Sequence, residues 1–118
     1  MTNRRQIRDY LQDILEYSEK AMRFAADKPD AAALEADERT FLAIIRALEV
    51  IGEAARQIPR DFRERHPDLP WQGMTGMRDV LIHAYFGVDV NVIWRTVKEE
   101  LPRLSQRVRQ LLTELSDE

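Results

Sequence analysis

The hydrophobic residues of this chain recur at the spacing of an α-helix along most of its length. Charged residues occupy one face of the segment from 7 to 25, and the opposite face carries a stripe at helical spacing that consists of Ile7, Leu11, Ile14, Ser18, Ala21 and Ala25. This pattern predicts a first helix that ends near Ala26, before Pro29. The Ala-rich, acidic segment from 30 to 36 predicts a loop or a frayed helix start.

A second helical pattern begins near Asp37 or Glu38, whose carboxylates suit a helix N-terminus. Its apolar stripe consists of Phe41, Ile44, Leu48, Ile51, Ala55 and Ile58. Pro59 ends this helix or opens a short turn that reaches Arg65. Two prolines within residues 66–70 then predict a loop.

A third pattern starts within residues 70–73 and runs to about Phe86, with Gly87 placed to cap its end. Its predicted core face consists of Met74, Met77, Leu81 and Ala84. Asp89 is placed to cap a last helix, which carries an apolar stripe as far as Leu115. Pro102 predicts a kink or break within it, because proline removes a backbone hydrogen bond and clashes with the preceding turn.

No strand pattern is present, and the short connections favour antiparallel neighbours. The sequence therefore predicts an all-α fold, an antiparallel bundle of four to five helices that forms one domain over residues 1–118.

Composition restricts the chemistry. The chain has no cysteine, which excludes disulfides and thiolate metal sites, and its two distant histidines make a poor metal site, so we expect no metal and no cofactor. A net charge of −3 argues against a generic nucleic-acid binder, so any RNA chemistry would need a local basic cleft. Neither a signal stretch nor an apolar run of the roughly 18 residues that span a bilayer is present, and we expect a cytoplasmic protein.

The two histidines occur in different settings. His66 lies between Arg65 and Pro67, which predicts a solvated loop residue. His83 lies in the otherwise apolar run 77–86, which also contains Arg78, Asp79 and Tyr85. A polar cluster inside such a run must be paired, or must face a cleft or a partner.

The spacing within this cluster suggests a chemistry. Asp79 and His83 are i, i+4 neighbours on a helix, so the carboxylate can orient the imidazole and favour its charged form. Arg78 and His83 lie about 140° apart, so they meet only if the arginine swings across or a twofold axis brings two copies into one groove. Histidine can deprotonate the 2′-hydroxyl of RNA, and arginine can stabilise the scissile phosphate. The spacing alone is not specific, and a satisfied surface or interface histidine is the alternative.

A wider motif surrounds this pair: Pro70-Trp71, Met74, Gly76-Met77-Arg78-Asp79, Leu81-Ile82-His83 and Tyr85-Phe86-Gly87. It resembles the signature of HepT-like toxins of the HEPN superfamily, which carry an Arg-x4–6-His motif often continued as His-x-Tyr. Residues 51–54, 92–97 and 101–102 match as well, so the resemblance spans nearly the whole chain. It implies a HEPN-type bundle and a metal-independent endoribonuclease of a type VII-like toxin–antitoxin system, a homodimer with Arg78 and His83 as its catalytic pair.

The resemblance also implies a partner, an MntA-like nucleotidyltransferase antitoxin that adds AMP to Tyr85. A bulky anionic adduct beside Arg78 would occupy the phosphate site and repel RNA. Residues two apart on an ideal helix point nearly opposite ways, so Tyr85 and His83 share a cleft only if the helix ends or distorts there. A structural tyrosine packed beside Phe86 is the alternative.

Glu53, which follows Gly52, is expected to be a solvated or interface carboxylate, or else to support the cleft. Trp71 and Trp94 are expected to be core or interface aromatics. A solvated basic face that could guide RNA is expected from Arg103, Arg107 and Arg109. Two other functions stay open: a non-catalytic helical subunit, or substrate-binding partner, of a nucleotidyltransferase, and a plain dimeric interaction module.

Overall fold

The computed structural model describes the backbone of residues 3–84 and 89–116, and their side chains outside 78–84. The elements are α1 (Arg4–Ala25), α2 (Ala31–Ala36), α3 (Glu38–Gln57), α4 (Arg60–Arg65), α5 (Trp71–Ala84), α6 (Val90–Arg95), the π-helical turn η1 (Thr96–Glu100) and α7 (Leu101–Ser116). All regular structure in these two ranges is helical, which confirms the predicted all-α class.

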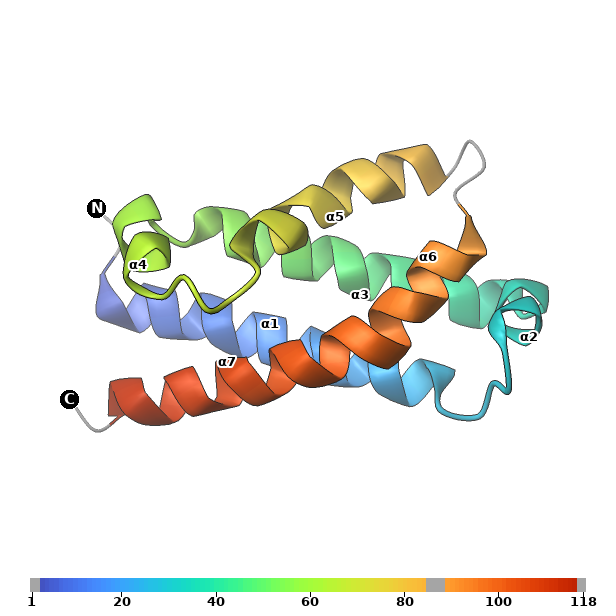
Figure 1. Ribbon diagram of the computed structural model, residues 1–118, viewed down its shortest axis with the longest axis horizontal. Helices are drawn as coiled ribbons and strands as arrows, with labels where there is room; N and C mark the ends of the chain where they lie inside the picture. Colours follow the sequence, from blue (N-terminus) through green and yellow to red (C-terminus); the bar gives the residue numbers. More distant parts are fainter. Residues whose placement is uncertain (1–2, 85–88, 117–118) are drawn as a thin grey trace.

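The long helices run in alternating directions and pack side by side (Figure 1). In the bundle α3 lies between α1 and α5, and α7 packs along α1. The short helix α4 lies at the same end of the molecule as both chain termini, whereas α2 lies at the opposite end (Figure 1). Because α4 and a short loop join α3 to α5, these two helices are antiparallel neighbours.

The core is formed by the apolar stripes that the sequence predicts. Fully buried members include Leu11, Ile14, Ile44, Leu48, Ile51, Met74, Ile93, Leu101 and Val108. Ser18 is the buried polar residue among those described, and its hydroxyl donates to the Ile14 carbonyl at 2.7 Å. The buried hydroxyl of this one polar residue in the first stripe therefore finds its hydrogen-bond partner within its own helix.

The segment from 30 to 36 corrects one expectation, because it forms the short helix α2 rather than a loop or frayed start. The Asp30 side chain accepts a hydrogen bond from the Ala33 backbone N–H and caps the first turn. Leu34 on this helix is completely buried. A cap together with one apolar anchor thus holds a helix too short to be stable by propensity alone.

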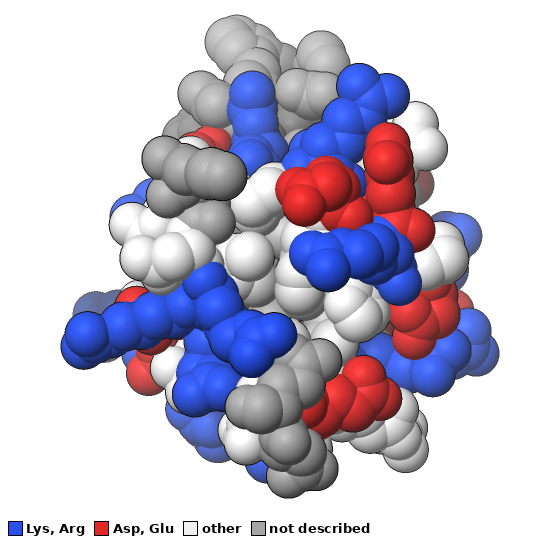
Figure 2. Space-filling view, turned by 90° about the vertical axis from the view of Figure 1, so that its left-hand side faces the viewer, with Lys and Arg blue, Asp and Glu red and all other residues white. Residues whose placement is uncertain are grey.

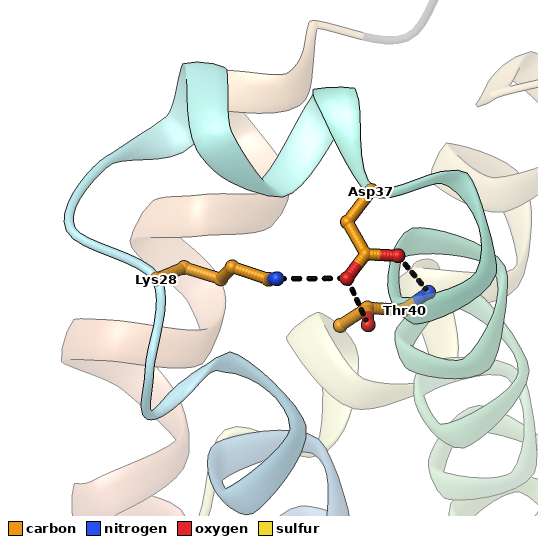
Figure 3. Close-up of polar contacts among 3 residues, drawn as sticks. All are labelled: Lys28, Asp37 and Thr40. Carbon is orange, nitrogen blue, oxygen red and sulfur yellow. Dashed lines mark hydrogen bonds and ion pairs between the residues drawn. The ribbon is translucent and has the colours of Figure 1, made fainter.

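The start of α3 is held by a polar cluster that links three segments (Figure 3). Asp37 caps the helix by accepting from the Thr40 N–H at 3.1 Å and the Thr40 hydroxyl at 2.7 Å. Lys28, after α1, approaches the same carboxylate at 2.7 Å. These contacts, led by the hydrogen bond from Lys28, hold the pKa of Asp37 well below its usual range.

The last helical stretch changes direction where the sequence predicts a disturbance (Figure 1). The disturbance is the π turn η1, in which the Leu101 N–H donates to the Thr96 carbonyl, five residues earlier. Pro102 follows at the second position of α7. A π turn widens the helix just before a residue that cannot donate its own hydrogen bond, so the chain continues as a helix instead of breaking.

The remaining predicted boundaries agree with the structure. Asp89 caps α6 by accepting from the Asn91 N–H, and Pro59 precedes the short helix α4. The predicted end of the third helix at Phe86 and its Gly87 cap lie outside the described residues. Within the described ranges, the helices are either too short or too polar to cross a membrane.

Candidate functional site

The start of α5 is fixed by aromatic packing against α4. Trp71, the first residue of α5, is buried, and its indole Nε1 donates to the His66 carbonyl at 2.8 Å. Its ring meets the Phe62 ring edge to face, with the ring centroids 6.4 Å apart. The expectation that Trp71 is a core aromatic is therefore confirmed, and Trp94 likewise packs against the core with Lys98 Nζ over its ring.

His66 corrects a second expectation, because it is half-buried rather than solvated. Its imidazole packs on the Phe62 ring, with the centroids 4.5 Å apart. The short helix α4 brings Phe62 one turn before His66, and Trp71 covers the same ring from α5. His66 is thus part of the junction between α4 and α5.

Two faces of α5 line different hollows. Gly73, Met74 and Met77 line an apolar hollow of about 210 Å³ against α3, α6 and α7. Gln72, Thr75 and Gly76 line an open groove of about 530 Å³ whose other lining residues are Arg56 of α3 and Arg63 of α4. These five residues, Arg56, Arg63, Gln72, Thr75 and Gly76, are called the basic groove below.

The arginines of the basic groove have no anionic partner in the described part of the chain, where neither Arg56 nor Arg63 forms an ion pair. The Nε of Arg63 is shielded from solvent and makes no hydrogen bond. Arg60, which lies on the same short helix, contrasts with them because its Nε meets Glu64 at 3.2 Å. The groove therefore holds positive charge that the described residues leave uncompensated.

The predicted catalytic positions lie further along α5. Arg78, Asp79 and His83 all belong to this helix, which is continuous to Ala84. Positions 79 and 83 are one turn apart, as predicted, and both lie within about 40° of Gln72 around the axis of an ideal helix. They therefore continue the row of α5 positions that lines the basic groove. Their side chains, and Tyr85 entirely, lie outside what the structure describes.

Glu53 lies on α3, one turn before Arg56, and is half-buried, and the neighbouring Gly52 is buried. Arg78 lies two residues after Gly76 on α5. Because α3 and α5 are antiparallel, positions 53 and 78 both lie farther from the α4 end of the bundle than the basic groove does. This placement is compatible with the expected supporting role of Glu53, which stays a prediction.

The arginines of the basic groove are not among the residues that the sequence predicts for the site. The basic residues predicted to guide RNA are Arg103, Arg107 and Arg109 of α7, which are exposed as expected. Arg107 and Arg109 are nevertheless paired, with Asp68 at 3.4 Å and Glu19 at 2.7 Å. The signal that could have pointed to the groove is the basic run from 56 to 65, which the chain folds back beside the start of the motif-bearing helix.

Comparison with known proteins identifies the family. Residues 7–111 match the model of the family described as "Ribonuclease HepT-like". A protein of Thermococcus cleftensis named "Probable ribonuclease HepT" is 49% identical over 108 residues, which cover 92% of this chain and 97% of that protein. Two proteins of Methanocaldococcus jannaschii named "Putative RNase" are 42% and 40% identical, with 90% and 97% of this chain covered, and 96% and 97% of theirs. None of the solved structures compared with the chain matches it significantly.

The chain therefore belongs to the HepT-like ribonuclease family. This confirms the resemblance seen in the motif around α5, and with it the expected enzyme class, a ribonuclease.

Proposed function

We propose that this protein is a metal-independent endoribonuclease toxin of the cytoplasm in which Arg78 and His83 carry the chemistry. The observation that carries the proposal is the family match over residues 7–111, which includes the Arg78-x4-His83-x-Tyr85 motif. The position of residue 83 on α5, on the face of the helix that lines a groove of uncompensated arginines, supports it further. A polyanionic substrate such as RNA suits such a surface.

The proposed reaction uses the nucleophile that RNA itself carries. His83 takes the proton of a ribose 2′-hydroxyl, and the 2′-oxygen forms a bond to the adjacent phosphorus. The bond from phosphorus to the 5′-oxygen breaks, and that oxygen takes up a proton. The products are a 2′,3′-cyclic phosphate and a 5′-hydroxyl. The guanidinium of Arg78 stabilises the charge that develops on the phosphoryl oxygens.

A homodimer is part of the proposal. Positions 78 and 83 lie about 140° apart on an ideal helix, so one copy of α5 does not present both on one face. A twofold axis beside α5 would bring both copies of the pair into one cleft, where His83 of the partner subunit can protonate the leaving oxygen. Light scattering at micromolar concentration tests this, and a monomer would contradict the dimeric cleft.

Control by an MntA-like nucleotidyltransferase antitoxin completes the proposal. The Tyr85 hydroxyl attacks the α-phosphorus of ATP, a phosphodiester to AMP forms, and pyrophosphate leaves while the phenolic proton is released. The adduct carries negative charge seven residues after Arg78. Like-charge repulsion and occupation of the phosphate site then exclude RNA.

The decisive experiment digests RNA with purified protein. We expect His83→Ala and Arg78→Ala each to lower cleavage by a factor of at least about a hundred while the helical circular dichroism is retained. His66→Ala is the matched histidine control, because it removes an imidazole outside the motif and keeps the backbone carbonyl that accepts from Trp71, and it should cleave at the normal rate. Full cleavage by His83→Ala would reject the proposed chemistry. Absence of cleavage by the unmodified wild type would favour a non-catalytic subunit.

A further inference from the structure

We propose that the basic groove binds the phosphodiester backbone of single-stranded RNA next to the point of cleavage. This inference rests on the proposed ribonuclease function and names Arg56 and Arg63 as substrate-positioning residues. It concerns residues of α3 and α4, which lie outside the Arg-x4-His motif.

The first support is the state of the two arginines. The Nε of Arg63 is removed from solvent and lacks a hydrogen-bond acceptor, which is a costly arrangement for a charged donor. Neither guanidinium is paired with a described carboxylate, although most of the ion pairs in the described ranges involve arginine. A phosphate in the groove would supply the missing anionic partner of the two guanidinium groups, because the guanidinium fork matches its oxygens.

The second support is the shape and lining of the groove. Its α5 wall contains an amide, Gln72, a hydroxyl, Thr75, and Gly76, where an added Cβ would meet nothing within 4 Å. Side-chain amides such as that of Gln72 commonly contact phosphate and sugar oxygens, whereas the Thr75 hydroxyl already donates to the Gln72 carbonyl at 3.1 Å. The open surface at Gly76 lets a strand approach the helix backbone closely. Carboxylates are absent from the residues that line this groove.

The third support is the direction of the groove. Position 83 lies seven residues beyond Gly76 on the same face of α5, about 10 Å along the helix axis. A strand seated on Arg56 and Arg63 and continuing along this face therefore leads toward His83. Such a local site also explains how a chain with a net charge of −3 can hold a polyanion.

The surrounding surface is favourable as well. Figure 2, which looks onto the end of the molecule that carries α4, shows several exposed Lys and Arg side chains, with Asp and Glu gathered mainly toward one side. A second open hollow lies beside the basic groove and shares Arg63, Gln72 and Thr75 with it, and Arg60 also lines it. Glu64 lines this second hollow too and pairs with Arg60 at 3.2 Å, so Arg63 is the arginine of the hollow that no described carboxylate pairs.

The test measures RNA binding in the cleavage-deficient His83→Ala background, with a fluorescent single-stranded RNA at several salt concentrations. We expect Arg56→Ala and Arg63→Ala each to weaken binding about tenfold and to lower the salt slope by about 0.7 per lost phosphate contact. Arg63→Gln provides a second variant that keeps the length of the side chain. Arg23→Ala is the control, because it removes an exposed arginine from α1, which α3 separates from α5.

A second measurement separates this inference from the proposed function. With active protein, Arg63→Ala should raise KM for long RNA with little change in kcat, and should leave cleavage of a dinucleotide unchanged. Equal loss on both substrates would place Arg63 in the chemistry or the folding and overturn the inference. Unchanged RNA binding and salt slope would overturn it too, even if wild-type cleavage is normal. Loss of antitoxin binding alone would assign the groove to the protein partner instead.

Discussion

The indole Nε1 of Trp71 donates a 2.8 Å hydrogen bond to the backbone carbonyl of His66. This bond joins the first residue of α5 to His66, the residue that follows and caps α4. It therefore fixes the start of the motif-bearing helix relative to Arg63, and holds together the two walls of the basic groove.

Trp71→Phe should lower the free energy of unfolding by about 1 kcal/mol, because it removes the indole donor and leaves the His66 carbonyl unsatisfied. Urea denaturation measures this loss. His66→Ala tests the same junction with the hydrogen bond preserved, since the acceptor is a backbone atom. If Trp71→Phe unfolds at the same urea concentration as the wild type, the hydrogen bond contributes nothing to the junction.

The cluster around Asp37 predicts a dependence of stability on pH. The folded pKa of this carboxyl is lowered by Lys28 and Thr40, so its stabilising effect is complete above the unfolded pKa of about 3.9. It is lost as the pH falls below that value toward the folded pKa. Asp37→Asn retains a capping side chain but removes the charge, and should be less stable than the wild type at neutral pH.

Denaturation of both proteins across the acid range provides the check. The difference in unfolding free energy between wild type and Asp37→Asn should shrink as the pH falls below about 4. A difference that stays constant from neutral to acid pH would show that the carboxylate charge is not responsible.

Asp79 is predicted to orient His83, because the continuous α5 helix places the two positions one turn apart. Asp79→Asn should therefore lower the cleavage rate, but by less than the factor of about a hundred or more expected for His83→Ala. Single-turnover kinetics with saturating protein measure both rates. An Asp79→Asn rate equal to that of the wild type would leave Asp79 without a catalytic role.

The fold could be predicted from the sequence because burial follows helical periodicity. Each position of the predicted stripe from Ile7 to Ala25 is buried, including Ser18. The helix α2 was missed because its stability depends on the Asp30 cap and on burial of Leu34 by the rest of the bundle, which a local pattern does not contain. His66 was misjudged for the same reason, since its partner Phe62 belongs to another short helix.

Part of the candidate site could be predicted from the sequence, and part could not. The motif on α5 could be read from residues close together in the sequence. Arg56 and Arg63 could not be assigned to it, because they lie fifteen or more residues before Arg78. Arg56 reaches the groove because α3 packs along α5, and Arg63 because α4 folds back beside the start of α5. Tertiary contacts bring these arginines together with the motif-bearing helix.

Modification of Tyr85 predicts a change in mass. Coexpression with an MntA-like nucleotidyltransferase should add one or more AMP units to the intact protein, and Tyr85→Phe should stay unmodified. Ribonuclease activity should be lost only in the modified form, and the unmodified protein should remain active. Full neutralisation with unchanged mass would mean that the partner inhibits by binding.

The most direct test of the central claim identifies the ends that cleavage produces when EDTA is present. Because the proposed nucleophile is the 2′-hydroxyl of the substrate, we expect undiminished cleavage, 2′,3′-cyclic phosphate and 5′-hydroxyl ends, and no cut at a position that carries a 2′-deoxyribose. Loss of activity on chelation, or products with 3′-hydroxyl and 5′-phosphate ends, would contradict a metal-independent reaction carried by Arg78 and His83.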